Sequence, residues 1–549
     1  MLRSAPSRWP DPAGGRPDPE RLGTESPAIS PGLLSRLYLP VFSALLLWRL
    51  FLAWRFPFLG DEAYFLLWGR HPALGYYDHP PMLGWWLAPL VQLSESPFLA
   101  RLPTVIGIAL MGWILYRAAR PVVGEERASG ASLLLLLSPF YVVDVFVLTD
   151  TPLMLFTLGS GILYWRATVR DSLPLYAGAG VLLGLAILSK YLAGLLALAY
   201  LLRVLLVSRS SRQTRGLLVL GVAATPFLLF NLWWNAENCW PNLFFNLVSR
   251  HVGEAERYTW KNVLICGATH LWFLSPVGLV LVSRRWRRIR RAARDRLWSP
   301  PVFAALVPLA LLTISPFFGP FGAYWVLSFY PFLYLLFARV LEPSEMRLLV
   351  SSMAVFAVAH VALFTWAVTR PLETWEERSF YDALVMMERP AELAERVESR
   401  AEGRPLVALG YSPASLLAWG TGGPVAVFGP GSHYARQDDY WTDWSRYRDG
   451  SLAIFSKEPP ARESLIPYFE STRIVDLSLA GAEYHLVLGD GFRYRRYRDE
   501  VLEEIRRRYY PVPPWLPDSG CPVPPAEDFS ACSRPFFACS FGARIRAVP

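Results

Sequence analysis

The stretch LLSRLYLPVFSALLLWRLFLAWRFPFLGDEAY, residues 33–64, decides the class of fold. Its first part, residues 33–57, is predominantly apolar, and about 20 such residues are enough for a helix to cross the hydrocarbon core of a bilayer. Two adjacent acids, Asp61 and Glu62, follow directly after this run. Carboxylates are costly beside hydrocarbon, so acids at this depth are expected to line a cavity or a functional site.

The composition of the whole chain agrees with a membrane protein. Of 549 residues, 53% are apolar and 18% are charged, and the mean hydropathy is +0.27. These values exceed what a soluble protein of this size normally shows. We therefore predict a polytopic α-helical membrane protein with about eleven transmembrane helices, at residues 33–57, 98–117, 129–147, 150–166, 173–188, 191–207, 216–234, 262–282, 300–317, 322–339 and 348–369.

The loops between these runs differ strongly in basic residues. One alternate set holds nineteen arginines, eight of them between Arg284 and Arg296, whereas the opposite set holds five basic residues in all. Cytoplasmic loops carry the excess of Lys and Arg, so the N-terminus is predicted to be cytoplasmic and Asp61 to face outward. The net charge of +9 is thus a topology signal and does not indicate nucleic-acid binding.

The chain divides into three parts. Residues 1–30 are rich in Pro, Ser, Gly and Arg, and we expect a disordered cytoplasmic segment without a cleavable signal peptide. Residues 31–370 form the transmembrane domain. Residues 371–549 are mostly polar and predict an extracytoplasmic α/β domain, with strands at 406–409, 425–428 and 484–488 and helices at 391–398 and 499–508. Its three cysteines, Cys521, Cys532 and Cys539, leave any disulfide pairing undetermined.

Polar residues from several separate loops are predicted to reach the outer side: Asp61, Glu62, Asp78, His79, Asp144, Asp150, Lys190, Glu237, Arg250, His251 and Lys261. Convergence of acids and bases at one depth is typical of a membrane-embedded active site. Simpler explanations stay open for individual residues. Asp61 and Asp150 are each suited to cap a helix, and Lys190 can reach lipid headgroups. Lys190 otherwise needs an anionic partner, since no acid lies near it in sequence.

Six motifs, in order along residues 33–370, resemble the GT-C glycosyltransferases of bacteria. The resemblance is to the branch related to dolichyl-phosphate-mannose protein mannosyltransferases and lipid A aminoarabinose transferases. The motifs are Asp61-Glu62-Ala63-Tyr64, Tyr76-Tyr77-Asp78-His79-Pro80-Pro81, Arg101-Leu102-Pro103, Thr149-Asp150-Thr151-Pro152, the run Gly184 to Tyr191, and the run Asn231 to Ala236. The segment from Gly431 to Trp441 also looks like the tail of the same branch.

The resemblance implies a sugar transfer from a polyprenyl-phosphate carrier to an acceptor hydroxyl of a lipid, glycan or protein. The reaction would invert the anomeric carbon on the outer face of the inner membrane. It implies that Asp61 is the general base, that Glu62 positions it, and that Asp150 orients sugar or acceptor. Cations would stabilise the leaving phosphate, with Lys190 and Arg250 as the main candidates. Arg101 and His79 complete the expected phosphate set, and Tyr64, Tyr77, Asp78, Tyr191 and His251 the expected substrate pocket.

The chain departs from the family at two places. Lipid A transferases carry Glu-Lys-Pro where this chain has Asp78-His79-Pro80, so His79 replaces a lysine. Many relatives have a basic residue and His-Trp where this chain reads Gly322-Ala323-Tyr324-Trp325, so no metal or phosphate contact is carried over to that place. No cofactor is expected, and a divalent metal requirement stays open.

Two other classes of function compete with the glycosyltransferase. A transporter or lipid flippase would share the buried charges, but it predicts inverted repeats, which the sequence does not show. A non-catalytic scaffold that presents its outward domain leaves Lys190 and the first acids unexplained.

Overall fold

The computed structural model describes residues 32–208, 210–246, 260–319, 321–429, 436–510, 512–513 and 516. The chain forms two compact units, each built from segments far apart in sequence. The first unit comprises Met1–Leu74, His79–Asn231 and His251–Trp375, and the second comprises Gly75–Asp78, Leu232–Arg250 and Glu376–Pro549. The division at residues 375 and 376 lies near the sequence-based boundary at 370, but two short segments expected in the membrane domain belong to the second unit.

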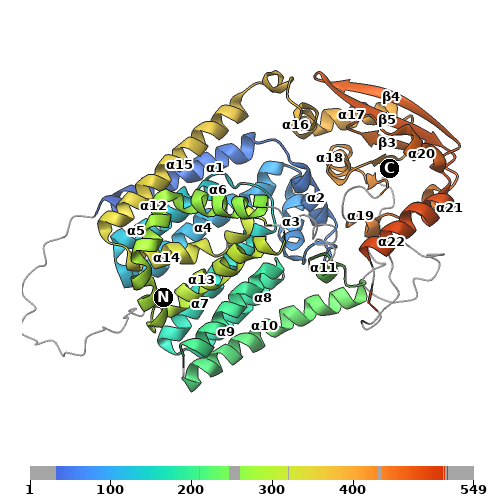
Figure 1. Ribbon diagram of the computed structural model, residues 1–549. Helices are drawn as coiled ribbons and strands as arrows, with labels where there is room; N and C mark the ends of the chain where they lie inside the picture. Colours follow the sequence, from blue (N-terminus) through green and yellow to red (C-terminus); the bar gives the residue numbers. More distant parts are fainter. Residues whose placement is uncertain are drawn as a thin grey trace, which may run out of the picture. The chain divides into compact units, whose positions relative to one another are not determined.

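The first unit is helical (Figure 1). Its main helices are α1 (Leu33–Arg55), α2 (Gly60–Arg70), α3 (Met82–Leu93), α4 (Pro97–Val123), α5 (Glu125–Leu137), α6 (Pro139–Val143), α7 (Asp150–Arg170), α8 (Leu173–Ile187), α9 (Gly194–Leu206), α10 (Ser211–Glu237), α12 (Trp260–Arg294), α13 (Ser299–Ile314), α14 (Tyr330–Val340) and α15 (Pro343–Thr369). The last six residues of α10, from Leu232 on, belong to the second unit. Four single turns complete it: η2 (Tyr191–Ala193), η5 (Ser315–Phe317), η6 (Ala323–Val326) and η7 (Leu372–Trp375).

Each of the eleven runs predicted to cross the membrane lies on one helix or on consecutive helices. Among the described residues, six helices are long and apolar enough to cross by length and composition: α1, α4, α10, α12, α13 extended through η5, and α15. Shorter apolar helices, which include α3, α8, α9 with η2, and α14, accompany them. A multi-pass membrane protein is therefore well supported, and the number of eleven crossings stays a prediction.

The core of the first unit lies around α5, whose residues from Ala128 to Leu137 are all buried. This helix packs against α1, α4, α14 and α15. Glu126 in its first turn also accepts hydrogen bonds from the backbone N–H groups of Leu34 (3.2 Å) and Ser35 (3.0 Å). An acid from α5 thus satisfies the open donors at the start of α1, where the helix dipole favours negative charge.

The second unit contains a five-stranded mixed sheet. Its strands are β1 (Leu406–Ala408), β2 (Ala426–Val427), β3 (Leu452–Ser456), β4 (Ser471–Leu479) and β5 (Ala482–Asp490), in the order β2-β1-β3-β5-β4. β1 runs parallel to β2 and β3, and β5 runs antiparallel to β3 and β4. Ala480 (φ 49°) and Gly481 (φ 82°) join β4 to β5. Positive φ at both positions is the geometry of the two-residue turns that suit the twist of a hairpin.

Helices precede, separate and follow these strands along the chain: α16 (Tyr381–Glu388), α17 (Pro390–Arg400), α18 (Tyr411–Thr421), α19 (Asp438–Trp441), α20 (Arg462–Leu465), α21 (Tyr494–Tyr497) and α22 (Glu503–Tyr509), with the short segments η8 (Trp444–Tyr447), η9 (Ile466–Tyr468) and η10 (Arg498–Leu502). The strands predicted at 406–409, 425–428 and 484–488 coincide with β1, β2 and β5, and the predicted helices with α17 and with η10 and α22. Strands and helices alternate along this unit, and β3 and β4 were not among the predicted strands.

The segments Gly75–Asp78 and Leu232–Arg250 are held within the second unit by polar contacts. The backbone N–H of Tyr77 donates to the Gln437 amide oxygen (2.7 Å), and the Asn242 side chain, on α11 (Pro241–Phe244), donates to the Tyr76 carbonyl (3.1 Å). Cys239 is disulfide-bonded, whereas Cys266 of the first unit is a buried free thiol. Cys521, Cys532 and Cys539 lie outside the described residues.

Candidate active site

The first acidic pair lies in the first turn of α2, and its two members differ in burial. Asp61 is exposed, whereas the Glu62 side chain has no accessible surface. Negative charge is favoured at a helix N-terminus, which explains the placement of both acids but not their difference. The exposed carboxylate is the one of the pair that is accessible to a substrate.

Glu62 forms a buried ion pair with Arg101 of α4. The Arg101 Nε–H and one Nη2–H donate to the two Glu62 carboxylate oxygens at 2.8 and 2.5 Å. The other donors of Arg101 reach three backbone carbonyls at 2.7 to 2.8 Å, those of Ala53, Phe56 and Pro57. All five N–H groups of the guanidinium are therefore engaged.

This geometry disagrees with the phosphate contact expected for Arg101. The side chain has no donor left for a phosphate oxygen, and it is buried between α1, α2 and α4. Arg101 instead fixes the turn between α1 and α2, from which Asp61 emerges. Glu62 is likewise buried behind the exposed acid, so both side chains hold the turn that carries Asp61.

A second set of contacts ties α2 to the start of α7. The backbone N–H of Val147 donates to Glu62 (3.1 Å), and the Thr104 hydroxyl donates to the carbonyl of Phe146 (2.8 Å). Thr104 also shares a hydrogen bond with the hydroxyl of Thr151 (2.9 Å). The loop before α7 is thus anchored to the same carboxylate that anchors α2, which brings the N-terminal ends of the two helices into one cluster.

Asp150, the first residue of α7, pairs with Lys190. The Lys190 ammonium lies 3.0 Å from each Asp150 carboxylate oxygen, and both side chains are buried. The ammonium also lies 4.6 Å from the centre of the Tyr324 ring, which adds a cation–π contact. The anionic partner that the sequence requires for Lys190 is therefore a carboxylate from another part of the chain. An ammonium held at a fixed place by a carboxylate and an aromatic face is suited to bind a second anion.

Asp144 is a further buried acid to which sequence analysis assigned no role. It lies after α6, is 1% exposed, and is within electrostatic range of Asp150, Arg49 and Glu62. Among the described residues, its Oδ1 atom has no hydrogen-bond partner. Arg49, also buried, donates to the Tyr141 carbonyl (2.7 Å). Asp144 lies within the predicted span 129–147, and an acid in such an apolar run is the sequence signal for a buried functional group.

The aromatic residues expected near the site pack along α2. Tyr64 is buried, with its ring centre 5.3 Å from that of Trp68. The His79 ring lies 6.1 Å from the same indole. Tyr191, next to Lys190, donates its hydroxyl proton to the Asn231 side chain (2.6 Å). Tyr64, His79 and Tyr191 therefore belong to the same unit as the two ion pairs.

Four of the predicted site residues are not placed with the Glu62–Arg101 and Asp150–Lys190 pairs. Tyr77 and Asp78 belong to the second unit, where the Asn246 side chain donates to the Asp78 carbonyl (3.0 Å). Arg250 and His251 lie outside the described residues. Within the described residues, no group of three or more His, Cys, Asp or Glu side chains is arranged to hold a metal ion.

Comparisons with known proteins agree with the motif-based resemblance. Residues 78–234 match the family described as dolichyl-phosphate-mannose-protein mannosyltransferase. The chain is 29% identical over 185 residues to the lipid A galacturonosyltransferase RgtD of Rhizobium johnstonii, a match that spans 33% of this chain and 39% of that protein. The lipid A enzyme is thus matched over about two fifths of its length.

The fold is that of ArnT from Cupriavidus metallidurans. The crystal structure of ArnT bound to undecaprenyl phosphate aligns with a TM-score of 0.59 at 16% identity, over 82% of this chain and 98% of that one. The apo structure of ArnT aligns with a TM-score of 0.56. The resemblance to GT-C glycosyltransferases predicted from the motifs is therefore confirmed at the level of the fold.

Proposed function

We propose that this GT-C chain transfers a sugar from a polyprenyl-phosphate carrier to a hydroxyl of a lipid acceptor, with Asp61 as the general base. One observation carries the proposal. The exposed carboxylate of Asp61 lies next to Glu62, which is held by an arginine whose N–H groups are all engaged. Glu62 also binds the loop that leads to the Asp150–Lys190 pair. A positioned base and a positioned cation are the two groups that this reaction requires.

In the proposed reaction, the Asp61 carboxylate takes the proton of the acceptor hydroxyl. The hydroxyl oxygen then bonds to the anomeric carbon, and the bond from that carbon to the phosphate oxygen breaks with its electron pair on the phosphate. Attack from the side opposite the phosphate inverts the anomeric carbon. General base catalysis of this kind contributes a factor of about 10² to 10⁴ in rate.

The leaving group is a phosphate, which needs positive charge more than a proton donor. Lys190 supplies that charge in the proposal, because its ammonium has flexible donors that a phosphate oxygen can share with Asp150. Asp150 keeps the ammonium in place before the donor binds. Arg250 stays a proposed second phosphate contact, and Asp150 and Tyr191 stay proposed contacts of the sugar.

The names of the similar proteins support the choice of substrates. RgtD is a lipid A galacturonosyltransferase, and ArnT has been crystallised with undecaprenyl phosphate. They favour a lipid acceptor and a polyprenyl-phosphate donor over a protein acceptor. We further propose that the site and the second unit face the periplasm. The nineteen-to-five asymmetry of basic residues and the disulfide at Cys239 support this orientation, since disulfides persist in oxidising compartments.

The proposal is tested by mass spectrometry of envelope lipids from cells with and without the protein, followed by transfer assays on the purified chain. Asp61→Asn is expected to insert and fold normally and to lose transfer by at least about 100-fold. Glu95→Gln, which changes another acid in an exposed loop, serves as the matched control and is expected to retain transfer. Wild-type turnover by Asp61→Asn would remove Asp61 as the base.

A further inference from the structure

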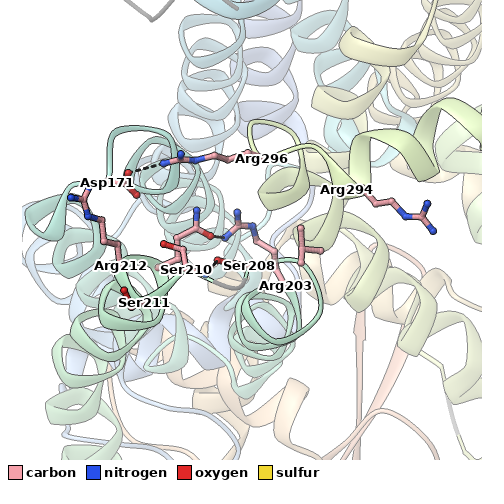
Figure 2. A pocket seen from close by; sticks show the side chains of 10 residues that line it. Asp171, Arg203, Ser208, Ser210, Ser211, Arg212, Arg294 and Arg296 are labelled. Carbon is pink, nitrogen blue, oxygen red and sulfur yellow. Dashed lines mark hydrogen bonds and ion pairs between the residues drawn. The ribbon is translucent and has the colours of Figure 1, made fainter.

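A polar cavity of about 470 Å³ lies where α7, α9, α10 and α12 end or begin (Figure 2). Its lining is dominated by arginine and serine: Asp171, Arg203, Val207, Ser208, Ser210, Ser211, Arg212, Gln213, Arg294 and Arg296. Cavities that hold small ligands have volumes of about 300 to 1,000 Å³. Four arginines against one acid make this cavity a candidate site for an anion.

The cavity is separate from the candidate active site. Asp150 begins α7, and Asp171 follows its last residue. At a rise of about 1.5 Å per residue, the 21 residues of α7 place the two acids about 30 Å apart. Arg203, in the last turn of α9, follows Lys190 by 13 residues, which at the same rise places it about 20 Å from that lysine. The cavity therefore lies at the opposite ends of the helices that hold the Asp150–Lys190 pair.

The one acid in the lining is already neutralised. Arg296 donates to Asp171 (2.7 Å), as Figure 2 shows. Arg294 points away from the other labelled side chains in the same view. Among the described lining residues, the positive charge that remains available to a ligand therefore comes from Arg203 and Arg212.

Arg203 is 1% exposed and is held rigidly at the cavity. Its Nε–H donates to the Ser299 hydroxyl (3.0 Å), and its Nη1 donates to the Gln213 amide oxygen (2.9 Å). Among the described residues, its Nη2 group has no hydrogen-bond partner. Nη1 also donates to the Tyr164 hydroxyl (3.4 Å), and the guanidinium carbon lies 5.8 Å from the centre of that ring. The Nη2 group is therefore the part of the guanidinium that stays open to a ligand.

The start of α10 adds backbone donors. The N–H groups of Gln213 and Thr214 donate to the Ser210 carbonyl. The N–H groups of Ser211 and Arg212, which precede them, have no partner among the described residues. The Arg212 side chain also makes no hydrogen bond or ion pair with any residue that the structure describes. Open N–H groups at the start of a 27-residue helix, beside arginine, favour a tetrahedral oxyanion.

We propose that this cavity binds a phosphate group, carried either by the headgroup of an anionic phospholipid or by a free phosphate ion. The planar fork of a guanidinium fits phosphate oxygens, and serine hydroxyls complete such sites. Basic pockets between membrane helices are known to accept anionic headgroups. The site would occupy the membrane face opposite to the proposed sugar transfer, and it does not depend on that reaction.

The test uses the purified full-length protein in neutral detergent, titrated with phosphatidylglycerol, with phosphatidylcholine and, in a separate arm, with inorganic phosphate at constant ionic strength. Lipid retention is read by native mass spectrometry and phosphate binding by calorimetry. Arg212→Gln removes one exposed, uncontacted arginine and is expected to weaken binding about fivefold, the factor for one arginine at a membrane surface. Arg294→Gln is the matched control, because it removes the same charge from a lining residue whose side chain points away from the other labelled side chains, and it is expected to bind as the wild type does.

Each outcome decides the proposal. Weaker retention of phosphatidylglycerol by Arg212→Gln alone identifies a headgroup site, and weaker binding of inorganic phosphate by Arg212→Gln alone identifies a free-phosphate site. The proposal is overturned if neither probe binds the wild-type protein, if phosphatidylcholine is retained as well as phosphatidylglycerol with no phosphate binding, or if both variants weaken binding equally.

Discussion

Replacing Glu62 by glutamine should destabilise the first unit far more than an ordinary loss of charge. Glu62 accepts two hydrogen bonds from Arg101, at 2.8 and 2.5 Å, and one each from the backbone of Leu59 (3.2 Å) and Val147 (3.1 Å). Both side chains of the ion pair are almost completely buried. Removing one partner of such a pair leaves an uncompensated charge and costs about 3 to 5 kcal/mol.

The matched control is Glu95→Gln. Glu95 pairs with Arg70 at 2.7 Å, but its side chain is 68% exposed. Ion pairs in water contribute about 0.2 to 1 kcal/mol, so this variant should unfold nearly as the wild type does. The free energy of unfolding of both variants can be measured by equilibrium denaturation in mixed micelles. A loss from Glu62→Gln within 1 kcal/mol of that from Glu95→Gln would refute the anchoring role of the buried pair.

A double variant tests how the pair acts. Buried ion pairs can often be replaced by apolar residues without loss, once both charges are removed. Here Arg101 also satisfies the carbonyls of Ala53, Phe56 and Pro57. Adding Arg101→Met to Glu62→Gln leaves these carbonyls without their donors, so stability should not recover. Full recovery would show that the three carbonyl contacts contribute little.

Three further predictions concern other parts of the chain. Lys190→Met should weaken binding of polyprenyl phosphate in a direct binding assay and leave the Asp150 carboxylate buried without its cation; unchanged binding would remove Lys190 from the phosphate site. Burial raises the pKa of Asp438 to about 7 in the folded protein, above its ordinary 3.8. The stability that it contributes is therefore complete below pH 4 and lost as the pH rises through 7, and Asp438→Asn should flatten the dependence of unfolding free energy on pH over that window, whereas an unaltered slope would contradict the assignment. A Cβ at Gly180 of α8 would lie 2.2 Å from the Leu220 carbonyl oxygen of α10, so Gly180→Leu should separate these helices and lower thermal stability in detergent; unchanged stability would show that the contact is dispensable.

The helical character of the first unit could be predicted from the sequence, because apolar runs of membrane length follow directly from the thickness of the bilayer. Lys190 illustrates how far the site could be predicted. Its isolation in an apolar run indicated a required partner, but the partner, Asp150, lies 40 residues away and is reached only through helix packing. Tyr324, at a place where the family pattern is absent, contacts the same ammonium, and no local signal indicated it.

Arg101 shows a second limit of sequence analysis. An arginine on the expected side of the membrane is equally compatible with a phosphate contact and with a structural anchor. The difference depends on the number of its N–H groups that the protein itself uses, and here the backbone of a distant turn uses three of the five. Tyr77 and Asp78 show a third limit. They lie in the segment Gly75–Asp78, which the sequence assigned to the transmembrane domain on either side of it but which belongs to the second unit.

The composition of the second unit has a consequence for biosynthesis. Its early segment, Gly75–Asp78, leaves the ribosome about 300 residues before Glu376, where the bulk of the unit begins. At about 5 to 20 residues per second, this segment waits about 15 to 60 seconds for its partners. During translation the N–H of Tyr77, whose partner is Gln437, must therefore be satisfied by water or by a chaperone, and a truncated product that ends near residue 375 would never acquire this contact.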